Sequence, residues 1–293
     1  MTSSTPSPDD TLSVSERDML GALEVLQTAA DEPRVLAVLS DEEILGTDGE
    51  VGLGILGSPY LEDERIERTV ASATAIRSLI ARGLVNPRPE GREDEGSMVI
   101  GDDDPSHRVV QLDRTLAGLL TLRRIPEGMV IVHRTSSNIS TTLGLYLFPE
   151  DGVLEEFVAA DGFHHFSVPT REVIAERLAQ FVDPHGAANE DDDVRELTAE
   201  EIASDSSLQD TRTLSVLTIA GIGEGRQATV FALSASVLLL DNGVLDPTEE
   251  SSDGAGGAAG TMAISSVSPE SLRDLLASLV PQVTQDEDSD PAA

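Results

Sequence analysis

Histidine and carboxylate side chains are the groups in this sequence that could carry acid–base or metal chemistry. His164 and His165 are adjacent in a strand-like segment, residues 162–168 (GFHHFSV). Because successive side chains of a strand point to opposite faces, these two imidazoles cannot bind one metal ion. Glu155 and Glu156 alternate in the same way, so one is expected to face solvent and the other a groove. The spacing selects no metal site, and it leaves open an enzyme with a dispersed carboxylate site.

Lysine and cysteine chemistry is excluded, because all 19 basic residues are arginine and the cysteine count is zero. Without lysine the chain has no lysine-containing phosphate loop and no Schiff-base nucleophile. Without cysteine it has no disulfide, thiol nucleophile or thiolate metal site. The glycine-rich residues 221–225 (GIGEG) precede a strand, whereas a dinucleotide loop must open a helix, so we expect a hairpin turn there. We therefore expect no cofactor and no enzymatic activity.

The charge balance argues against nucleic acid and membrane as partners. The chain carries 54 acidic and 19 basic residues, a formal net charge of −35, and a polyanion of this size repels phosphate backbones and anionic lipid. Residues 69–85 instead favour nucleic-acid binding, because they resemble the recognition helix and wing entry of a winged helix. The stretch that follows, 86–106, is acidic where a wing would contact phosphate. A winged-helix regulatory protein is therefore kept as an alternative, and no nucleic-acid partner is expected.

The ends of the chain have the composition of disordered tails. Residues 1–12 and 283–293 are rich in small, acidic and proline residues. Residues 1–12 also lack the basic start and apolar run of a secretion signal, and no stretch approaches the ~18 apolar residues of a membrane span. We expect a soluble cytoplasmic protein with a single body, residues 13–282, between two tails.

The first part of this body has the pattern of helices around one short strand. Ser13 and Glu16 form a capping box before an apolar helix. Residues 34–39 (RVLAVL) predict a buried strand, and apolar residues at helical spacing predict a long helix over 62–82. Asp113 predicts the start of a further helix, because an aspartate side chain can accept the first free N–H groups.

After these helices the hydrophobic period changes to that of strands. Short polar or glycine-containing turns separate the strands, which favours antiparallel pairing. Strands are predicted over residues 128–134, 141–148, 153–158, 162–168, 211–219, 226–233, 236–241 and 261–267. A helix follows each group of four, the first over 170–182 and the second from Ser268 and Pro269. We predict an α+β fold of two pseudo-symmetric halves, residues 13–182 and 197–282, each an antiparallel four-stranded sheet flanked by helices.

Several short segments share a pattern with one known protein family. They are the leucine-rich helix Met19–Leu26, RVLAVL at 34–39, the spaced residues Glu64, Arg65, Ala75, Leu79, Arg82, Gly83, Leu84 and Val85, LAGLLTLRRIPEGMVIVHR at 116–134, and the helix start SVPT at 167–170. In this order they resemble the EspG family, cytoplasmic chaperones of type VII (ESX) secretion in actinobacteria, over residues 13–282. The family has a mixed α/β fold with quasi-twofold halves, which agrees with the repeat. The acidic insertion at 86–106 departs from the family pattern.

The resemblance implies a non-enzymatic chaperone or adaptor that binds helical secretion substrates of the PE/PPE type and keeps them soluble for export. Its partner would be a helical secreted protein or a heterodimer, and a homodimer of the chain itself stays open. In the family the loop between the second and third strands contacts the cargo, and by order of elements this loop is 135–140 here. Ser137, Asn138 and Ile139 are therefore candidate partner-binding residues, and Arg273 on the C-terminal helix is a candidate for cargo carboxylates. A solvated hairpin turn and an ordinary surface arginine are the alternative interpretations.

Overall fold

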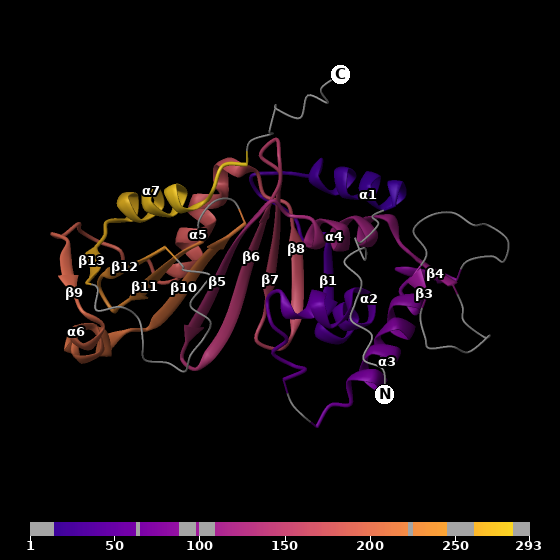
Figure 1. The fold of residues 1–293 in the computed structure, drawn as a ribbon, viewed down its shortest axis with the longest axis horizontal. Helices are drawn as coiled ribbons and strands as arrows, with labels where there is room; N and C mark the ends of the chain where they lie inside the picture. The colour runs from indigo at the N-terminus through magenta and orange to yellow at the C-terminus, as the bar shows by residue number, and fades with distance from the viewer. Residues whose placement is uncertain are drawn as a thin grey trace, which may run out of the picture.

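A ten-stranded antiparallel sheet forms the centre of the molecule (Figure 1). The computed structural model describes residues 15–62, 65–87, 98–99, 109–221, 225–244 and 261–283. The order of strands across the sheet is β1-β8-β7-β6-β5-β10-β11-β12-β13-β9. Their bounds are β1 Ala37–Ser40, β5 Gly128–Ser136, β6 Ile139–Leu147, β7 Val153–Val158, β8 Phe163–Ser167, β9 Arg195–Leu197, β10 Thr213–Ala220, β11 Arg226–Ala232, β12 Val237–Val244 and β13 Met262–Ser266. A second sheet, in the order β2-β4-β3, contains β2 Val85–Pro87, β3 Met98–Val99 and β4 Val109–Leu112.

The two predicted groups of four strands belong to one sheet rather than to two. β5 pairs with β10 from Met129 opposite Ala220 to Ser136 opposite Thr213. Two separate sheets would leave β5 and β10 as edges, each with a row of unpaired N–H and C=O groups. Their pairing satisfies these groups, and β1 and β9 extend the sheet at its two ends. The α+β class and the antiparallel strands are as predicted.

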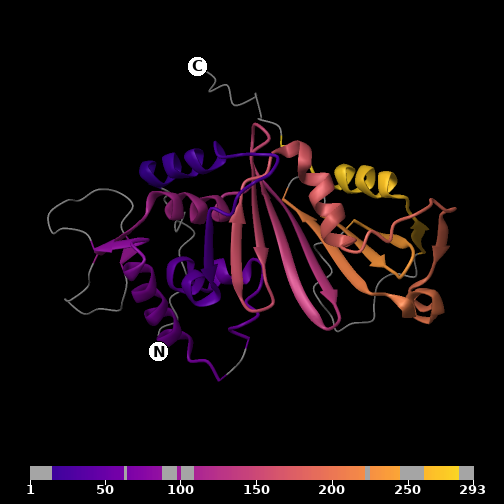
Figure 2. The ribbon, with the colours of Figure 1, turned by 180° about the vertical axis from the view of Figure 1, so that it is seen from behind.

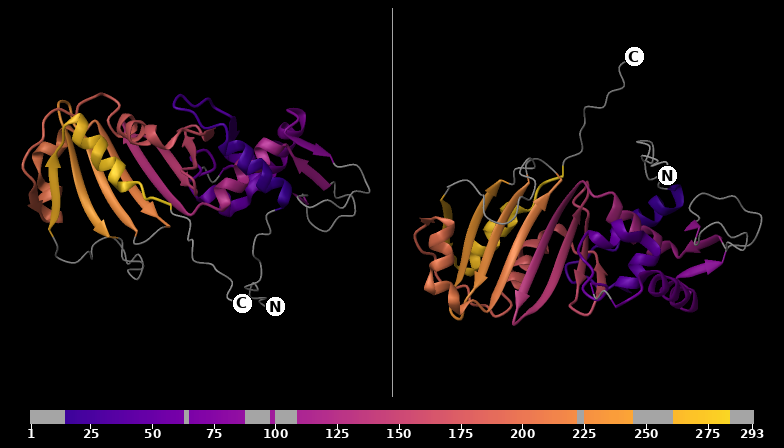
Figure 3. Two further views of the ribbon diagram at one scale, coloured as in Figure 1. Left: turned by 90° about the horizontal axis from the view of Figure 1, so that it is seen from above. Right: turned by 60° about the horizontal axis from the view of Figure 1, so that its bottom comes forward.

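Helices cover both faces of the sheet. They are α1 Glu16–Leu26, α2 Asp41–Gly54, α3 Arg68–Ala81, α4 Arg114–Arg124, α5 Ile174–Val182, α6 Ala199–Ser204 and α7 Pro269–Leu279. Tyr146 and Leu154 face the core that contains α1–α4, whereas their neighbours Leu145 and Val153 face the core that contains α5 and α7. Seen from behind, α5 and α7 lie in front of the strands, and α7 crosses the C-terminal strands on this face (Figures 2 and 3). Alternate side chains of each strand are therefore buried in two different hydrophobic cores.

Local capping signals set where the first helices begin. The hydroxyl of Ser40 accepts from the Glu43 N–H, and the Glu43 carboxylate accepts from the Ser40 N–H, both at 3.3 Å. This capping box begins α2, a helix that the sequence analysis missed although the Ser-x-x-Glu signal is present. The N-cap of α1 is Ser15, whose hydroxyl accepts from the Asp18 N–H at 3.2 Å. The predicted cap, Ser13, lies outside the described residues.

α3 is shorter than the helix predicted over 62–82. The carboxylate of Glu67 accepts from the Val70 N–H at 2.8 Å and so caps the start of the helix. Gly83 follows its end with a φ of +74°, a left-handed conformation that glycine adopts without strain. Residues 61, 62 and 65 therefore lie in turns rather than in the helix.

α1 and α4 cross at a pair of glycines. A Cβ atom on Gly118 of α4 would lie 2.4 Å from the carbonyl carbon of Gly21 on α1, well inside van der Waals contact. The two backbones approach this closely because neither residue has a side chain. Leu119 and Leu120, beside Gly118, are then buried in the core. This crossing holds α4, which carries Arg123 and Arg124 toward the sheet.

Some predictions concern residues that the structure does not describe. The predicted tail 1–12, residues 284–293 of the second tail, and Glu64 of the family pattern lie outside the described residues. Val283, the first residue of the second predicted tail, packs against the core beneath α5 and α7. Among the described residues, no helix combines the length and the apolar character that crossing a membrane requires.

Candidate functional site

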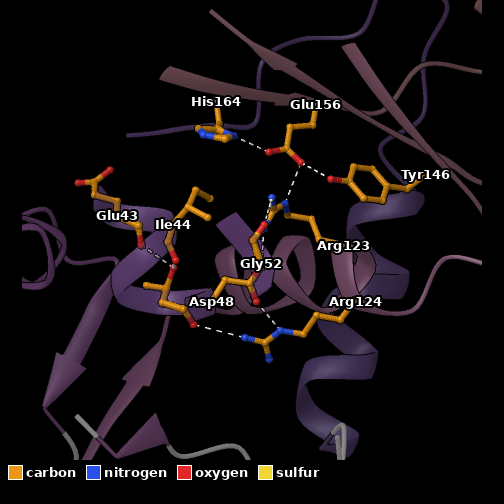
Figure 4. Close-up of polar contacts among 10 residues, drawn as sticks. Glu43, Ile44, Asp48, Gly52, Arg123, Arg124, Tyr146, Glu156 and His164 are labelled. Atoms are coloured by element: carbon orange, nitrogen blue, oxygen red, sulfur yellow. Dashed lines mark hydrogen bonds and ion pairs between the residues drawn. The ribbon is translucent and has the colours of Figure 1, made fainter. Parts of the chain in front are cut away.

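The most concentrated cluster of ionisable side chains lies between α2, α4 and strands β6–β8 (Figure 4). α2 provides two carboxylates, α4 two guanidinium groups, β7 a carboxylate and β8 an imidazole. In the order of their contacts these residues are Asp41, His164, Glu156, Arg123, Asp48 and Arg124. We call this set the buried ion network.

Glu156 is the centre of the buried ion network. Its Oε2 accepts from Arg123 Nε at 2.8 Å and from the Tyr146 hydroxyl at 2.6 Å, and its Oε1 lies 2.6 Å from His164 Nδ1. Burial alone raises the pKa of this carboxyl, but the Arg123 charge and the His164 hydrogen bond outweigh burial and bring the pKa to about 2. Burial and the Glu156 charge also raise the pKa of Tyr146, so its hydroxyl keeps its proton and donates.

His164 contacts a carboxylate at each ring nitrogen. Nδ1 faces Glu156, and Nε2 lies 2.8 Å from Asp41 Oδ1. Ionised carboxylates only accept hydrogen bonds, so this geometry favours the imidazolium form, which donates from both ring nitrogens. Burial lowers the pKa of His164, but the hydrogen bonds to Asp41 and Glu156 outweigh it, and the net direction is upward. The other oxygen of Asp41 accepts from the Tyr60 N–H at 2.8 Å, which fixes the orientation of this carboxylate.

Arg123 joins the sheet to α2. Besides its bond to the β7 carboxylate, it donates to Asp48 and to the carbonyl oxygen of Gly52 at 3.0 Å. Arg124 donates to the other carboxylate oxygen of Asp48. The network then holds three carboxylates and three cations, and it is neutral when the imidazole is protonated. Buried charges are tolerated in an interior of low dielectric only when they are paired in this way.

Solvent does not reach the centre of this network. The side chains of Arg123, Glu156 and His164 are 0% exposed. Glu155 and Glu156 do point to opposite faces, but both are buried, so the prediction that one faces solvent is wrong. Arg177 of α5 covers Glu155 with an ion pair in which Nε lies 2.8 Å from Oε2. The buried ion network therefore attaches α2 and α4 to the sheet, and it lacks the access that a substrate needs.

The histidines and carboxylates do not form a metal site in the part of the chain that the structure describes. There, no group of three or more histidine, aspartate or glutamate side chains converges closely enough to hold an ion. The adjacent histidines serve different faces, because His164 lies in the buried ion network and His165 lines a pocket on the other side.

The predicted partner-binding residues Ser137, Asn138 and Ile139 lie at the tip of the β5–β6 hairpin. Ser137 and Asn138 form the two-residue turn, with φ of 50° and 65°, as expected for the tightest hairpin connection. Ile139 is the first residue of β6 and pairs with Ser136. It is 57% exposed, so the tip presents an isolated apolar side chain to solvent.

Arg273 lies on α7, away from this tip. In Figures 1 and 2 the β5–β6 hairpin is at the lower edge of the molecule and α7 at the upper edge. The Arg273 guanidinium lies 3.4 Å from the Glu176 carboxylate on α5 and donates to the carbonyl oxygen of Pro269 at 3.2 Å. The structure therefore brings together Ser137, Asn138 and Ile139 but not Arg273.

Sequence reasoning missed a pocket beside the hairpin. The pocket has a volume of about 490 Å³ and lies among strands β5–β8, α5 and residues 33–35. Its charged and aromatic residues are Arg134, Glu155, Phe157, His165, Arg177 and Phe181. Arg134 pairs with Thr141 two residues along the strands from the Ser136–Ile139 pair, so the pocket and the hairpin tip share one face of the sheet. Strand alternation could have placed Arg134 on this face, but only the folded chain shows that α5 walls it.

Two arginines at the ends of α3 pair with carboxylates, which weakens the basic face that a winged helix needs. Arg68 pairs with Glu50 at 2.6 Å, and Arg82 pairs with Glu43 at 2.7 Å. These ion pairs neutralise both charges, which leaves less positive potential for a phosphate backbone.

No protein-family model and no curated protein sequence matches this chain.

Proposed function

We propose that this chain is a non-enzymatic cytoplasmic chaperone or adaptor of the EspG kind. It binds a helical secreted protein, or a heterodimer of the PE/PPE type, and keeps it soluble for type VII export. The observation that carries the proposal is the β5–β6 hairpin, which holds Ile139 at its tip with 57% of its surface exposed. An apolar side chain held clear of the surface suits insertion between the helices of a partner.

The hairpin is rigid enough for this role. Residues 128–147 form two strands that pair along their full length, and β10 supports β5 from the other side. The Ser137–Asn138 turn adds no loose residues. A preorganised contact loses little conformational entropy on binding, so one apolar tip can contribute more affinity than a flexible loop of the same composition.

Charge helps to select the partner. A formal net charge of −35 favours a cargo with basic residues around its apolar tip and keeps the free protein from self-association. The same negative charge repels acidic proteins and nucleic acid.

We also propose that the body arose by duplication into two related halves. Outward from the central β5–β10 pair, the strands run β5-β6-β7-β8-β1 on one side and β10-β11-β12-β13-β9 on the other. α5 follows β8 and α7 follows β13, and the two helices pack on each other. The same order on both sides supports a pseudo-twofold arrangement, as in the EspG family.

An enzyme with a dispersed carboxylate site is the alternative, and the burial of Glu156 and His164 weighs against it. A winged-helix regulatory protein is the other alternative, and the ion pairs of Arg68 and Arg82 weigh against that.

Co-expression with a set of helical secreted proteins of the PE/PPE type tests the proposal. We expect wild type to form a stoichiometric complex on size-exclusion chromatography. Ile139→Asp should weaken the complex at least tenfold, or about 1.4 kcal/mol, because a carboxylate at the tip would be buried without a partner. The fold should be unaffected, since Ile139 is largely exposed.

Val51→Asp is the matched control. Val51 lies on α2 and is 87% exposed, so the substitution makes the same change in charge and hydrophobicity away from the hairpin. It should bind as wild type does. A wild-type chain that forms no complex with any of these proteins would contradict the proposed function, and equal binding by the two variants would show that the hairpin tip does not contact the partner.

A further inference from the structure

The pocket beside the hairpin contains an arginine that no carboxylate of the described residues neutralises. Arg134 of β5 is half-buried and makes no ion pair with any described residue. Its Nη1 donates to the carbonyl oxygen of Phe181 at 3.0 Å, and its guanidinium carbon lies 4.1 Å from the centre of the Phe181 ring. These contacts use a single N–H donor of the guanidinium group. In a chain with 54 acidic and 19 basic residues, a half-buried cation without an acidic partner needs a reason.

The other charges of the pocket neutralise one another. Arg177 donates through Nε to Glu155 at 2.8 Å, and the Ser167 hydroxyl donates to the same carboxylate at 2.9 Å. Glu155 is thus engaged by two neighbours, and it does not contact Arg134. With two arginines and one glutamate, the pocket carries one net positive charge when His165 is neutral.

Two hydroxyl groups beside Arg134 also lack partners. Thr141 and Ser215 are its cross-strand neighbours on β6 and β10, so the three side chains share one face of the sheet. Both hydroxyl oxygens are buried, and neither has a hydrogen-bond partner among the described residues. Buried polar groups without partners are costly and therefore rare in folded proteins. Neither hydroxyl residue lines the pocket, so the hydrogen-bonding capacity open to a ligand there is that of the remaining Arg134 N–H donors.

Aromatic rings form a wall of the pocket beside Arg134, with Phe181 in contact with the guanidinium. The ring centre of Phe157 lies 5.9 Å from that of His165 and 6.2 Å from that of Phe181, the second pair edge to face. Leu143 lies on the sheet between these rings and β5. An apolar or aromatic body could pack against this wall while a charged end reaches Arg134.

We propose that this pocket binds a small organic anion in which one carboxylate is joined to an aromatic or branched apolar body. The carboxylate pairs with Arg134, and the body packs on Phe157, His165 and Phe181. The volume of about 490 Å³ lies within the range of pockets for small molecules. One net positive charge matches a monoanion, whereas a dianion such as a phosphate monoester would keep one charge unpaired. The inference does not rest on the proposed chaperone function, because Ile139 does not line the pocket.

Titration of 2-naphthoate with the full-length protein, followed by fluorescence anisotropy, tests this inference. The chain has no tryptophan and two tyrosines, so the protein contributes little background. We expect a dissociation constant of about 1 mM or tighter, as an ordinary ligand of roughly a dozen non-hydrogen atoms reaches. The neutral isostere 2-naphthalenemethanol should bind at least tenfold more weakly, because it cannot pair with the guanidinium.

Two variants distinguish the effect of Arg134 on naphthoate affinity from the effect of the protein's net charge. Arg134→Gln should reduce naphthoate affinity at least tenfold, to that of the neutral isostere, while circular dichroism shows an intact fold. Arg77→Gln removes the same charge from the exposed side of α3 and should leave affinity unchanged. Absence of naphthoate binding at 5 mM, equal binding of acid and alcohol, or equal loss in both variants would each overturn the inference. If Arg134→Gln fails to fold, the comparison of acid and alcohol on wild type still decides it.

Discussion

Replacement of Glu156 by glutamine should destabilise the fold more than any other conservative change in the sheet. Glutamine has nearly the same volume and keeps one acceptor oxygen, so the substitution removes the charge and little else. Three cations, Arg123, Arg124 and protonated His164, would then face the two remaining carboxylates, Asp41 and Asp48, with one positive charge in excess. An uncompensated charge in the interior is costly because solvent cannot stabilise it.

The pKa of Glu156 gives the size of the effect. It falls from an ordinary value of 4.5 to about 2 on folding. Each tenfold change in proton affinity corresponds to about 1.4 kcal/mol, so the ionised carboxylate contributes about 3 kcal/mol to the free energy of unfolding. A whole domain has only about 5–15 kcal/mol. The melting temperature should therefore fall by roughly 6–12 °C.

The pH dependence of this contribution has a definite direction. A carboxyl with a depressed pKa stabilises the fold above pH 4.5, and the stabilisation is lost as the pH falls toward 2. His164 acts in the opposite sense: its raised pKa gives a contribution that is complete below about 6.5 and is lost as the pH rises through the raised value. Both contributions are complete near pH 5.5. The difference between wild type and Glu156→Gln should shrink from about 3 kcal/mol at pH 5.5 to about 2 kcal/mol at pH 3.5.

Urea unfolding followed by far-ultraviolet circular dichroism measures this difference, because the chain has no tryptophan to report on unfolding. Glu155→Gln is the control: it makes the same substitution one residue earlier, on the other face, where the partner Arg177 is 33% exposed. A partly solvated pair should contribute about 1 kcal/mol or less. The reasoning is refuted if Glu156→Gln loses less than about 1 kcal/mol at pH 5.5, or if its deficit does not shrink at pH 3.5.

Three glycine and turn positions provide further tests, all measurable by thermal denaturation. Gly118→Ala should cost about 1–3 kcal/mol or more of the free energy of unfolding, because its Cβ would meet the Gly21 backbone at 2.4 Å. The control Gly54→Ala should be neutral, since no atom lies within 4 Å of its Cβ position. Equal effects of the two substitutions would disprove the close helix crossing. Asn138→Gly should preserve the hairpin, and Asn138→Val should destabilise it by about 1–2 kcal/mol, because a β-branched residue resists a φ of 65°. Gly83→Ala should cost about 1 kcal/mol, because a residue with a Cβ is strained at a φ of 74°. If stability does not fall, the left-handed end assigned to this helix is wrong.

Local patterns predicted most of the strands and several helix ends. The eight strands expected from alternation correspond to β5–β8 and β10–β13 within a few residues, since a half-buried strand must alternate wherever it lies. Asp113 begins α4 as predicted, with its carboxylate accepting from the Thr115 N–H at 3.0 Å. α2 escaped prediction because its glycines, at 46, 49, 52 and 54, weaken the helical pattern, and its stability comes from contacts with α3 and α4.

The candidate sites also differ in whether their residues are close together or far apart in the sequence. The hairpin tip could be found from the order of elements, because the turn and its neighbours are consecutive in the sequence. The buried ion network could not: Asp41 and His164 are 123 positions apart, and Arg123 and Glu156 are 33 apart. Sequence periodicity carries no information on which distant residues meet. The surroundings of Arg134 likewise depend on other elements, because its guanidinium contacts Phe181 of α5 while Glu155 of β7 pairs with Arg177.

By itself the sequence determined the charge of the protein, the lysine- and cysteine-free chemistry, the antiparallel strands and the opposite orientation of His164 and His165. These properties follow from composition and from the two-residue period of a strand. The tertiary structure decided what each face meets. α2 covers His164 and supplies Asp41, so this imidazole is buried between carboxylates and joins the helix to the sheet. α5 leaves a pocket over His165 that Arg134 also lines, so the neighbouring imidazole faces a pocket on the other side of the sheet.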